Sequence, residues 1–531
     1  MSITTERKRL ILWIAILATA TLLPILLGLL STPKGYNFGG FIYEARDSVS
    51  YLGKALEGQQ GQFFYLDPYT SEFQPHSYIF LPYILIGQLS RITPFSLIWL
   101  FHIIQLGFLF AIAVELYRVI SHYQESHKYR SLSFWVVLLG GGLGFIFAGP
   151  THLGPYTLIS LDVGVSGTQG LETLSLAPHI LLVVLSSLKL FSLWLKREEN
   201  SVIWLILRAF IWTLLISLAY PQMAVLWALI FTILLVTKIS KPNISLVLGS
   251  CLGAIPYVVY GLYLQNSNPI FQGWPPQQDI QIGDPLSYLL WGHFFMFPFL
   301  LIALYSLWKK RGKNLSKSIY LLPVTWIFLS AILMYTPGIP IIFHRVFYAS
   351  FIPFGILAVL GLRESLALIS SQKNRQRLLV YGTFLICLIT LQVAMEGVTT
   401  PLFHRNSLAL YFPSNEASVL EALQKSQPTS RHVLMSSYVS GLYVPALSGQ
   451  TAYLGFPFET LDLAKKQEEV SLFYNTSNKE GLKLQAQKLH ITYVLWGKYE
   501  KEFGGTDPGQ TAGWKTIIQK GDVKIYSTGE E

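Results

Sequence analysis

Two carboxylates near the start of the chain, Glu44 and Asp47, are the first candidates for chemistry. They are three residues apart, so a helix through this stretch would place both on one face. A carboxylate here could deprotonate a hydroxyl group or hold a divalent cation against a phosphate. Glu44 could raise the pKa of Asp47 or share a metal ion with it. The alternative is that Asp47 only caps a helix, where the macrodipole favours an acid.

Tyr51 follows Asp47 by four residues and is a candidate for substrate binding. His344 and Arg345 are adjacent near the end of an apolar run, in the segment IIFHRVFYASF. A guanidinium group in or near an apolar layer is costly and usually has an anionic partner. A phosphate would suit this planar donor. Arg345 could instead reach toward lipid headgroups.

Asp162 and His179 are weaker candidates for substrate binding. Asp162 lies in a polar segment, 150–176, and His179 follows Pro178 at the start of an apolar run. A single histidine in this position is more often a packed, hydrogen-bonded residue than a ligand. The two cysteines, Cys251 and Cys387, both fall within apolar runs, so no disulfide framework or zinc motif is indicated.

The composition indicates that membrane-spanning helices position these residues. Of the 531 residues, 52% are hydrophobic and 13% charged, whereas a soluble domain carries about 25% charged residues. Several apolar runs approach or exceed the roughly 18–20 residues that span a bilayer. The sequence therefore predicts a polytopic α-helical membrane protein with about eleven spans, at approximately 10–30, 95–118, 132–149, 177–195, 201–219, 222–237, 244–264, 285–307, 319–336, 340–362 and 377–396.

The net charge of +10 lies mainly in short loops between the apolar runs. This pattern is typical of membrane orientation and argues against nucleic-acid binding. It favours a cytoplasmic N-terminus, an uncleaved first span, and a segment at 77–90 that lies along the membrane interface rather than crossing it. Long polar loops at 31–94, 150–176 and 265–284 then face the outside, where we expect the function to lie.

The chain is predicted to divide into a transmembrane domain, 1–396, and an extracytoplasmic domain, 397–531. Strands are expected at 432–437, 451–454 and 492–496, with a closing hairpin at 515–519 and 523–526. Helices are expected at 461–474, where the apolar residues share one face, and at 479–489. This alternation indicates a small α/β domain.

These features resemble the GT-C superfamily of integral-membrane glycosyltransferases, such as the protein O-mannosyltransferases and the bacterial lipid A aminoarabinose transferases. The segment ARDSVSYLGKALEGQQG is similar to the family's first external loop, in which an acid is catalytic. The segment HSYIFLPYILIGQL is similar to an interfacial helix, and FSLIWLFHIIQLGFLFAIAVELYRV to the second span. The segments APH and GLYVPALSGQTAYLGFPFET are similar to uncharacterised bacterial members.

The resemblance implies a glycosyltransferase of the bacterial plasma membrane. It would move a sugar from a polyprenyl-phosphate donor to an extracytoplasmic acceptor, with Asp47 as the base and Arg345 near the donor phosphate. A divalent cation, Mg²⁺ or Mn²⁺, is possible, although Arg46 rather than a second acid precedes Asp47. The alternatives are a non-catalytic subunit or assembly factor of a membrane complex, and a transporter of a lipid-linked saccharide.

Overall fold

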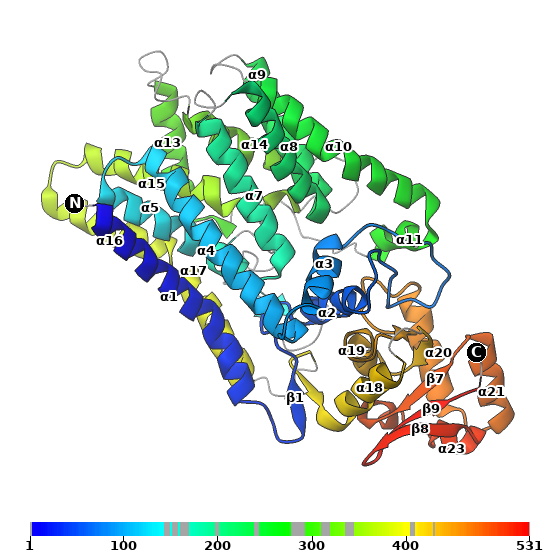
Figure 1. Cartoon of the computed structure of the whole chain (residues 1–531). Coiled ribbons are helices and arrows are strands. Elements are labelled where there is room, and N and C mark those ends of the chain that lie inside the picture. Colours follow the sequence, from blue (N-terminus) through cyan, green and yellow to red (C-terminus); the bar gives the residue numbers. More distant parts are fainter. Residues whose placement is uncertain are drawn as a thin grey trace. The chain divides into compact units, whose positions relative to one another are not determined.

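The computed structural model describes residues 3–142, 149–150, 158–159, 169–196, 201–237, 244–277, 292–309, 319–334, 345–403, 409–427 and 431–529. The chain forms two compact units (Figure 1). The membrane unit comprises Met1–Leu22, Ile104–Leu262 and Ile280–Glu396. The C-terminal unit comprises Leu23–Ile103, Tyr263–Asp279 and Gly397–Glu531. The first long loop, 31–94, thus folds together with the last part of the chain.

Within the described ranges, six helices are long and apolar enough to cross a membrane. They are α1 (Ile3–Leu30), α4 (Leu97–Tyr123), α7 (Pro178–Leu195), α8 (Val202–Ala219), α10 (Ile244–Ser267) and α15 (Phe351–Leu368). Shorter helices are α5 (His127–Leu139), α6 (Gly170–Leu174), α9 (Pro221–Val236), α13 (Phe297–Lys309), α14 (Leu321–Met334), α16 (Gln372–Ile386) and α17 (Ile389–Phe403). The predicted class, a polytopic α-helical membrane protein, is confirmed.

Glycines allow helices of the membrane unit to approach closely. On α10, a Cβ atom at Gly249 would lie 2.5 Å from the carbonyl oxygen of Ile206, and one at Gly253 would lie 2.5 Å from that of Phe210. These two glycines, four residues apart, therefore place the backbone of α10 directly against α8. Gly361 likewise lets α15 approach α13, because a Cβ atom at Gly361 would lie 1.7 Å from the carbonyl oxygen of Phe299.

The predicted span 377–396 is not one helix, because α16 ends at Ile386 and α17 begins at Ile389. The last residue of α5 and the backbone just after it form hydrogen bonds at this break. The N–H of Gly141 donates to the carbonyl of Ile386 (3.0 Å), and the hydroxyl of Thr390 donates to the carbonyl of Leu139 (2.6 Å). These partners are distant in sequence, so hydropathy alone could not reveal the break.

The C-terminal unit contains a five-stranded mixed sheet in the order β6 (Thr451–Ala452), β5 (Val433–Met435), β7 (Tyr493–Trp496), β9 (Val523–Ser527) and β8 (Lys515–Lys520). Strand β5 is parallel to β6 and β7, and β9 is antiparallel to β7 and β8. The predicted strands and closing hairpin are all present, so the α/β class of this domain is confirmed.

Alternate residues of β7 enter two different cores, as a strand covered on both faces requires. Tyr493 and Leu495 pack with α18 (Ser414–Ser426) and α19 (Tyr438–Ser448). Val494 and Trp496 pack with α20 (Leu463–Asn475) and α21 (Lys479–Lys488). The short helices α22 (Lys498–Lys501) and α23 (Pro508–Ala512) complete the domain.

Part of the first loop packs into this same domain. Helix α2 (Ala45–Gln59) contributes Ala45 and Val49 to the core under α18 and α19. Strand β1 (Tyr36–Phe38) pairs antiparallel with β4 (Tyr411–Pro413). Helix α3 (Leu81–Ser90) lies within the segment predicted for the interface, and α11 (Pro269–Gln277) belongs to this unit as well. Strands β2 (Gly149–Pro150) and β3 (Leu158–Ile159) form a separate pair.

Two fully buried acids, Glu416 and Glu500, interact electrostatically in the C-terminal unit. Glu500 accepts hydrogen bonds from the N–H groups of Ser437 (2.8 Å) and Gly497 (3.1 Å). Glu416 accepts one from the N–H of Lys498 (2.5 Å). Burial, followed by the charge of Glu500, raises the pKa of Glu416 to about 8.

We therefore expect the thermal unfolding midpoint to fall as the pH rises from about 5 to 8. In this window the unfolded chain has already released the Glu416 proton, whose ordinary pKa is 4.5, while the folded chain still holds it. Glu416→Gln keeps a hydrogen-bond acceptor and cannot ionise, so it should flatten this slope. The control is Glu421→Gln, an exposed acid on the same helix. Equal slopes in the two variants would contradict the prediction.

Candidate functional site

The predicted residues of the first loop lie at the start of α2. Glu44 immediately precedes the helix and has a left-handed backbone (φ 45°), which is uncommon for a residue other than glycine and is often found at functional sites. Asp47 lies in the first turn, where the helix dipole stabilises its negative charge. Both side chains are partly buried. The expected helix is present at Asp47, whereas Glu44 lies just outside it, so the two acids do not share a helix face.

Asp47 is close enough to the first residue of α19 to influence it. Burial raises the pKa of Tyr438, the charge of Arg46 lowers it, and the charge of Asp47 raises it. Asp47 thus lies beside a phenol of the C-terminal domain. Local sequence patterns could not predict this neighbour, because Tyr438 is almost 400 residues away from Asp47.

Tyr51, one turn after Asp47, belongs to an aromatic stack. Its ring is 4.5 Å from that of Tyr83 at an interplanar angle of 7°, and Tyr83 in turn stacks on Phe101 at 5.6 Å. The ammonium group of Lys54 lies 5.1 Å from the Tyr51 ring and 4.4 Å from the Phe80 ring. These contacts hold in place the two turns of α2 that follow Asp47.

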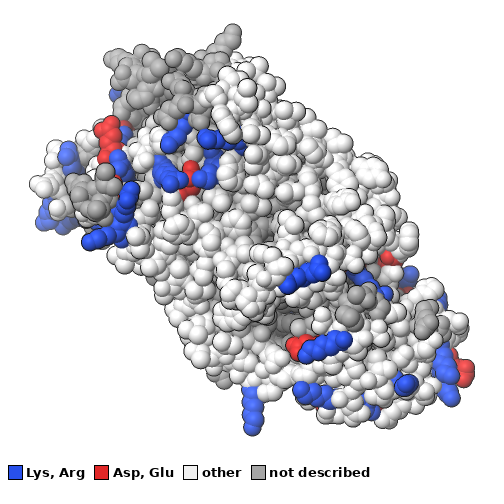
Figure 2. Space-filling view, in the orientation of Figure 1, with Lys and Arg blue, Asp and Glu red and all other residues white. Residues whose placement is uncertain are grey.

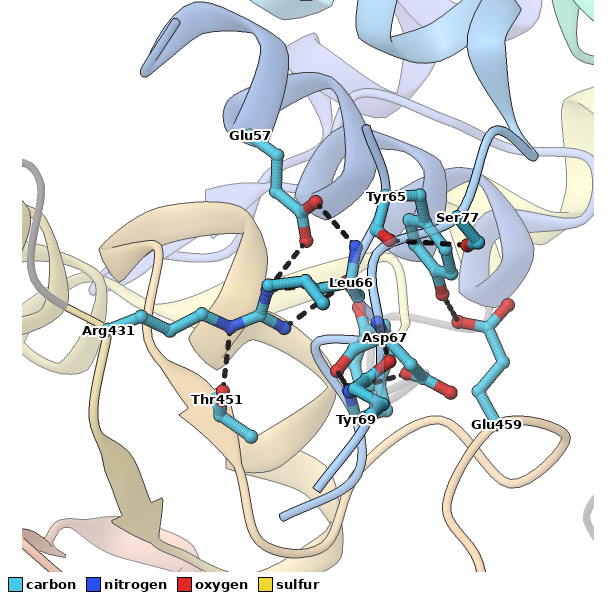
Figure 3. A network of polar contacts seen from close by, with 10 residues as sticks. Glu57, Tyr65, Leu66, Asp67, Tyr69, Ser77, Arg431, Thr451 and Glu459 are labelled. Atoms are coloured by element: carbon cyan, nitrogen blue, oxygen red, sulfur yellow. Dashed lines mark hydrogen bonds and ion pairs between the residues drawn. The ribbon is translucent and has the colours of Figure 1, made fainter. Parts of the chain in front are cut away.

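A buried ion pair joins α2 to the C-terminal domain. Lys54 Nζ lies 2.8 Å from Glu459 Oε1, and the side chains are 0% and 5% exposed. Tyr65 donates to the other carboxylate oxygen of Glu459 (3.1 Å), as Figure 3 shows. A buried pair of this kind needs such additional hydrogen bonds to offset desolvation.

A second ion pair lies one turn further along α2. Arg431 contacts Glu57 (3.1 Å) and also donates to the carbonyl of Leu66 and the hydroxyl of Thr451 (Figure 3). Burial raises the pKa of Glu57 to about 7, although Arg431 opposes this shift. Asp67, also fully buried, accepts a hydrogen bond from the N–H of Tyr69 (2.8 Å). Burial, then the charge of Glu459, raises its pKa.

In the membrane unit, Arg345 and His179 meet at one tyrosine. The guanidinium carbon of Arg345 lies 4.9 Å from the ring centre of Tyr220, and Nε2 of His179 is 2.5 Å from the Tyr220 hydroxyl. The Tyr348 ring is 4.6 Å from the Tyr220 ring. Within the part of the chain that the structure describes, the buried Nε atom of Arg345 has no hydrogen-bond partner. We call Arg345, Tyr220 and His179 the cationic–aromatic cluster.

Sequence reasoning did not select Tyr220. This residue joins α8 to α9, which begins at Pro221. The Tyr-Pro pair between two apolar runs is the one local signal that could have identified it. Two other predicted residues, His344 and Asp162, lie outside the described residues.

The side chains near Glu44 and Asp47 do not support the Mg²⁺ or Mn²⁺ site that was considered from the sequence. Among the residues that the structure describes, no group of three or more His, Cys, Asp and Glu side chains could hold a metal ion. Glu44 and Asp47 alone do not fit the oxygen-rich shell that Mg²⁺ requires. We therefore derive no step through a metal ion.

No protein-family model and no curated protein sequence matches the chain. Its fold is similar to that of the Archaeoglobus fulgidus oligosaccharyltransferase with a tethered acceptor peptide, at 12% identity and a TM-score of 0.48, over 94% of this chain and 72% of that one. The chain is also similar to the Archaeoglobus fulgidus enzyme AglB in complex with an inhibitory peptide and a dolichol-phosphate. The identity is 11% and the TM-score 0.44, over 91% of this chain and 69% of that one. For ArnT from Cupriavidus metallidurans bound to undecaprenyl phosphate, the identity is 9% and the TM-score 0.41, over 97% of this chain and 98% of that one.

All of these TM-scores are below 0.5. We draw no functional argument from likenesses of this size.

Proposed function

We propose that the chain is a membrane glycosyltransferase that moves a sugar from a polyprenyl-phosphate donor to a hydroxyl of an extracytoplasmic acceptor. The observation that carries the proposal is the cationic–aromatic cluster, in which a buried guanidinium nitrogen of Arg345 has no hydrogen-bond partner among the described residues. A lipid phosphate is an anion that fits such a donor beside membrane helices. The resemblance of the first loop to the GT-C superfamily supports the same class.

In the proposed reaction, the acceptor oxygen attacks the anomeric carbon of the sugar with inversion. The bond from this carbon to the phosphate oxygen breaks, and its electron pair stays with the departing polyprenyl phosphate. Arg345 stabilises the negative charge that grows on this phosphate. Such a leaving group needs a cation more than it needs a proton, so no general acid is required.

Asp47 is the proposed base, and it takes the proton of the acceptor hydroxyl as the new bond forms. Its place in the first turn of α2 suits this role, since the ion pairs of Lys54 and Glu57 hold that helix to the C-terminal domain. Glu44, which has a left-handed backbone, is proposed to raise the pKa of Asp47 through its negative charge. The proposed location is the bacterial plasma membrane, with the N-terminus in the cytoplasm and the C-terminal domain outside.

Donor binding is the first expected result. A short-chain polyprenyl-phosphate sugar at about 100 times its Kd should stabilise the folded wild type by about 2.7 kcal/mol and raise its thermal midpoint. Arg345→Gln should lose most of this increase, because the amide cannot neutralise a phosphate. Arg375→Gln, which removes an exposed arginine of α16, is the matched control and should keep it. An unchanged wild-type midpoint, or an equal increase in both variants, would contradict the proposed phosphate site.

A further inference from the structure

The first loop contains a segment, residues 65–77, that is closed on itself and bound to the edge of the C-terminal sheet. The N–H of Tyr65 donates to the carbonyl of Ser77 (2.7 Å), and the N–H of Ser77 donates to the carbonyl of Tyr65 (3.0 Å). The N–H of Ala452 in the edge strand β6 donates to the carbonyl of Pro68 (2.9 Å). We call residues 65–77 the docked segment.

Asp67 organises the docked segment. Its N–H donates to Oε1 of Gln74 (2.6 Å), and Nε2 of Gln74 donates to its carbonyl (2.9 Å). Its Oδ1 accepts a hydrogen bond from the N–H of Tyr69 (2.8 Å). The hydroxyl of Tyr69 donates in turn to the carbonyl of Leu442 in α19 (3.1 Å). The carboxyl group of Asp67 thus holds the turn that binds Tyr69 to the C-terminal domain.

The charged groups around Asp67 form a buried network. Figure 2 shows other Lys and Arg side chains at the surface of the C-terminal unit, in the lower part of the view, where water surrounds them. In the network, by contrast, four residues are buried and only the side chain of Arg431 is partly exposed, at 24%. The network consists of Lys54, Glu57, Asp67, Arg431 and Glu459. It contains three carboxyl groups and two cations.

Asp67 is the carboxyl group of this network that lacks a cation of its own. Glu459 pairs with Lys54, and Glu57 pairs with Arg431. Within the part of the chain that the structure describes, Oδ2 of Asp67 is buried and has no hydrogen-bond partner. An ionised carboxylate in this position would be a buried charge without compensation, which is costly. The arrangement therefore favours the protonated, neutral form of Asp67.

The other titratable groups of the docked segment do not supply the missing positive charge. Burial raises the pKa of Tyr65 and of Tyr69 above the ordinary value of 10.0, so both phenols stay neutral near pH 7. Glu72 forms its own ion pair with Lys466 (2.8 Å). His76 is exposed and lies against the ring of Phe64.

The protonation of Asp67 links the docked segment to pH. Burial, followed by the charge of Glu459, raises the pKa of Asp67 well above its ordinary value of 3.8. When the segment opens, the carboxyl group meets water and its pKa returns toward the ordinary value. Between these two pKa values the open form releases a proton that the closed form keeps. Opening therefore becomes more favourable as the pH rises.

We propose that Asp67 is a pH-sensitive latch, whose neutral side chain keeps residues 65–77 on the C-terminal domain and whose ionisation releases them. Release also removes a contact of α2, because Glu57 accepts a hydrogen bond from the N–H of Leu66 in the segment (3.2 Å). The sequence predicts that this loop faces the outside of the membrane, so the latch responds to the external pH. The latch does not depend on the proposed transferase reaction.

The test is hydrogen exchange of the purified full chain in a neutral detergent, from about pH 5.5 to about pH 7.5. Peptides that cover residues 61–80 report on the docked segment, and peptides from β7 and β9 report on the sheet. Dividing by the intrinsic exchange rates removes the ordinary effect of pH on exchange. The variant Asp67→Asn keeps an acceptor for the N–H of Tyr69 and cannot ionise. The control is Glu468→Gln, at an exposed acid of α20.

The protection of the wild-type segment should fall by roughly tenfold for each pH unit relative to Asp67→Asn, because opening releases one more proton. Glu57 and His76 are present in both proteins, so their titration cancels in this comparison. Glu468→Gln should behave like the wild type, and the strand peptides should stay more protected than the segment at every pH.

An equal pH dependence in the wild type and Asp67→Asn would overturn the latch. Equal protection of the segment and the strands would also overturn it, because the segment would then open only when the domain unfolds. If Asp67→Asn does not fold, the wild type decides by itself. Protection of the wild-type segment that stays constant over this pH range would overturn the proposal.

Discussion

Replacing Lys54 with methionine should lower the free energy of unfolding by about 3–5 kcal/mol, because it leaves the carboxylate of Glu459 buried without its cation. Lys54 is fully buried, and its ammonium group also contacts the hydroxyl of Ser50 (3.1 Å). Protein domains are stable by only about 5–15 kcal/mol, so this loss should reduce the yield of folded protein. The thermal midpoint and the protease resistance of the purified chain measure the effect.

Two further variants separate this pair from a general effect of losing a lysine. Lys465→Met changes an exposed residue of α20 and should leave the midpoint nearly unchanged. The double variant Lys54→Met/Glu459→Leu removes both charges and should be more stable than Lys54→Met alone. If Lys54→Met behaves like Lys465→Met, the ion pair does not hold α2 to the C-terminal domain.

Replacing Asp47 with asparagine should lower kcat/KM for sugar transfer by a factor of about 10²–10⁴, the usual contribution of a general base. The amide has nearly the same size and cannot take a proton, so the midpoint increase caused by the donor should remain. Asp522→Asn, at an exposed acid of the C-terminal unit, is the matched control. Full transferase activity in Asp47→Asn would remove this residue from the proposed mechanism.

The sequence predicted the parts of the fold that depend on local patterns. Apolar runs near 97–123 and 178–195 became α4 and α7, since hydrocarbon length sets the length of such runs. The strand at 493–496 and the helices at 463–475 and 479–488 followed from residue types and periodicity. The helix that contains Asp47 was predicted for the same reason, and Glu44 immediately precedes it.

The contacts that hold the candidate site were not predictable in this way. Lys54 and Glu459 are separated by 405 residues, and the pairing of β1 with β4 joins residues 36–38 to 411–413. A single sequence does not show which distant charges meet. The stretch around Lys54 shows a charged residue in a helix, and only the fold reveals that this residue is buried.

The most direct test of the central claim follows a donor labelled in its sugar. The purified wild-type chain is incubated with a polyprenyl-phosphate sugar and a cell-envelope extract that supplies acceptors. The proposed reaction predicts that free polyprenyl phosphate forms in the same amount as label leaves the lipid fraction. A donor that binds to the chain and stays intact would contradict the transferase and favour a non-catalytic subunit or a transporter.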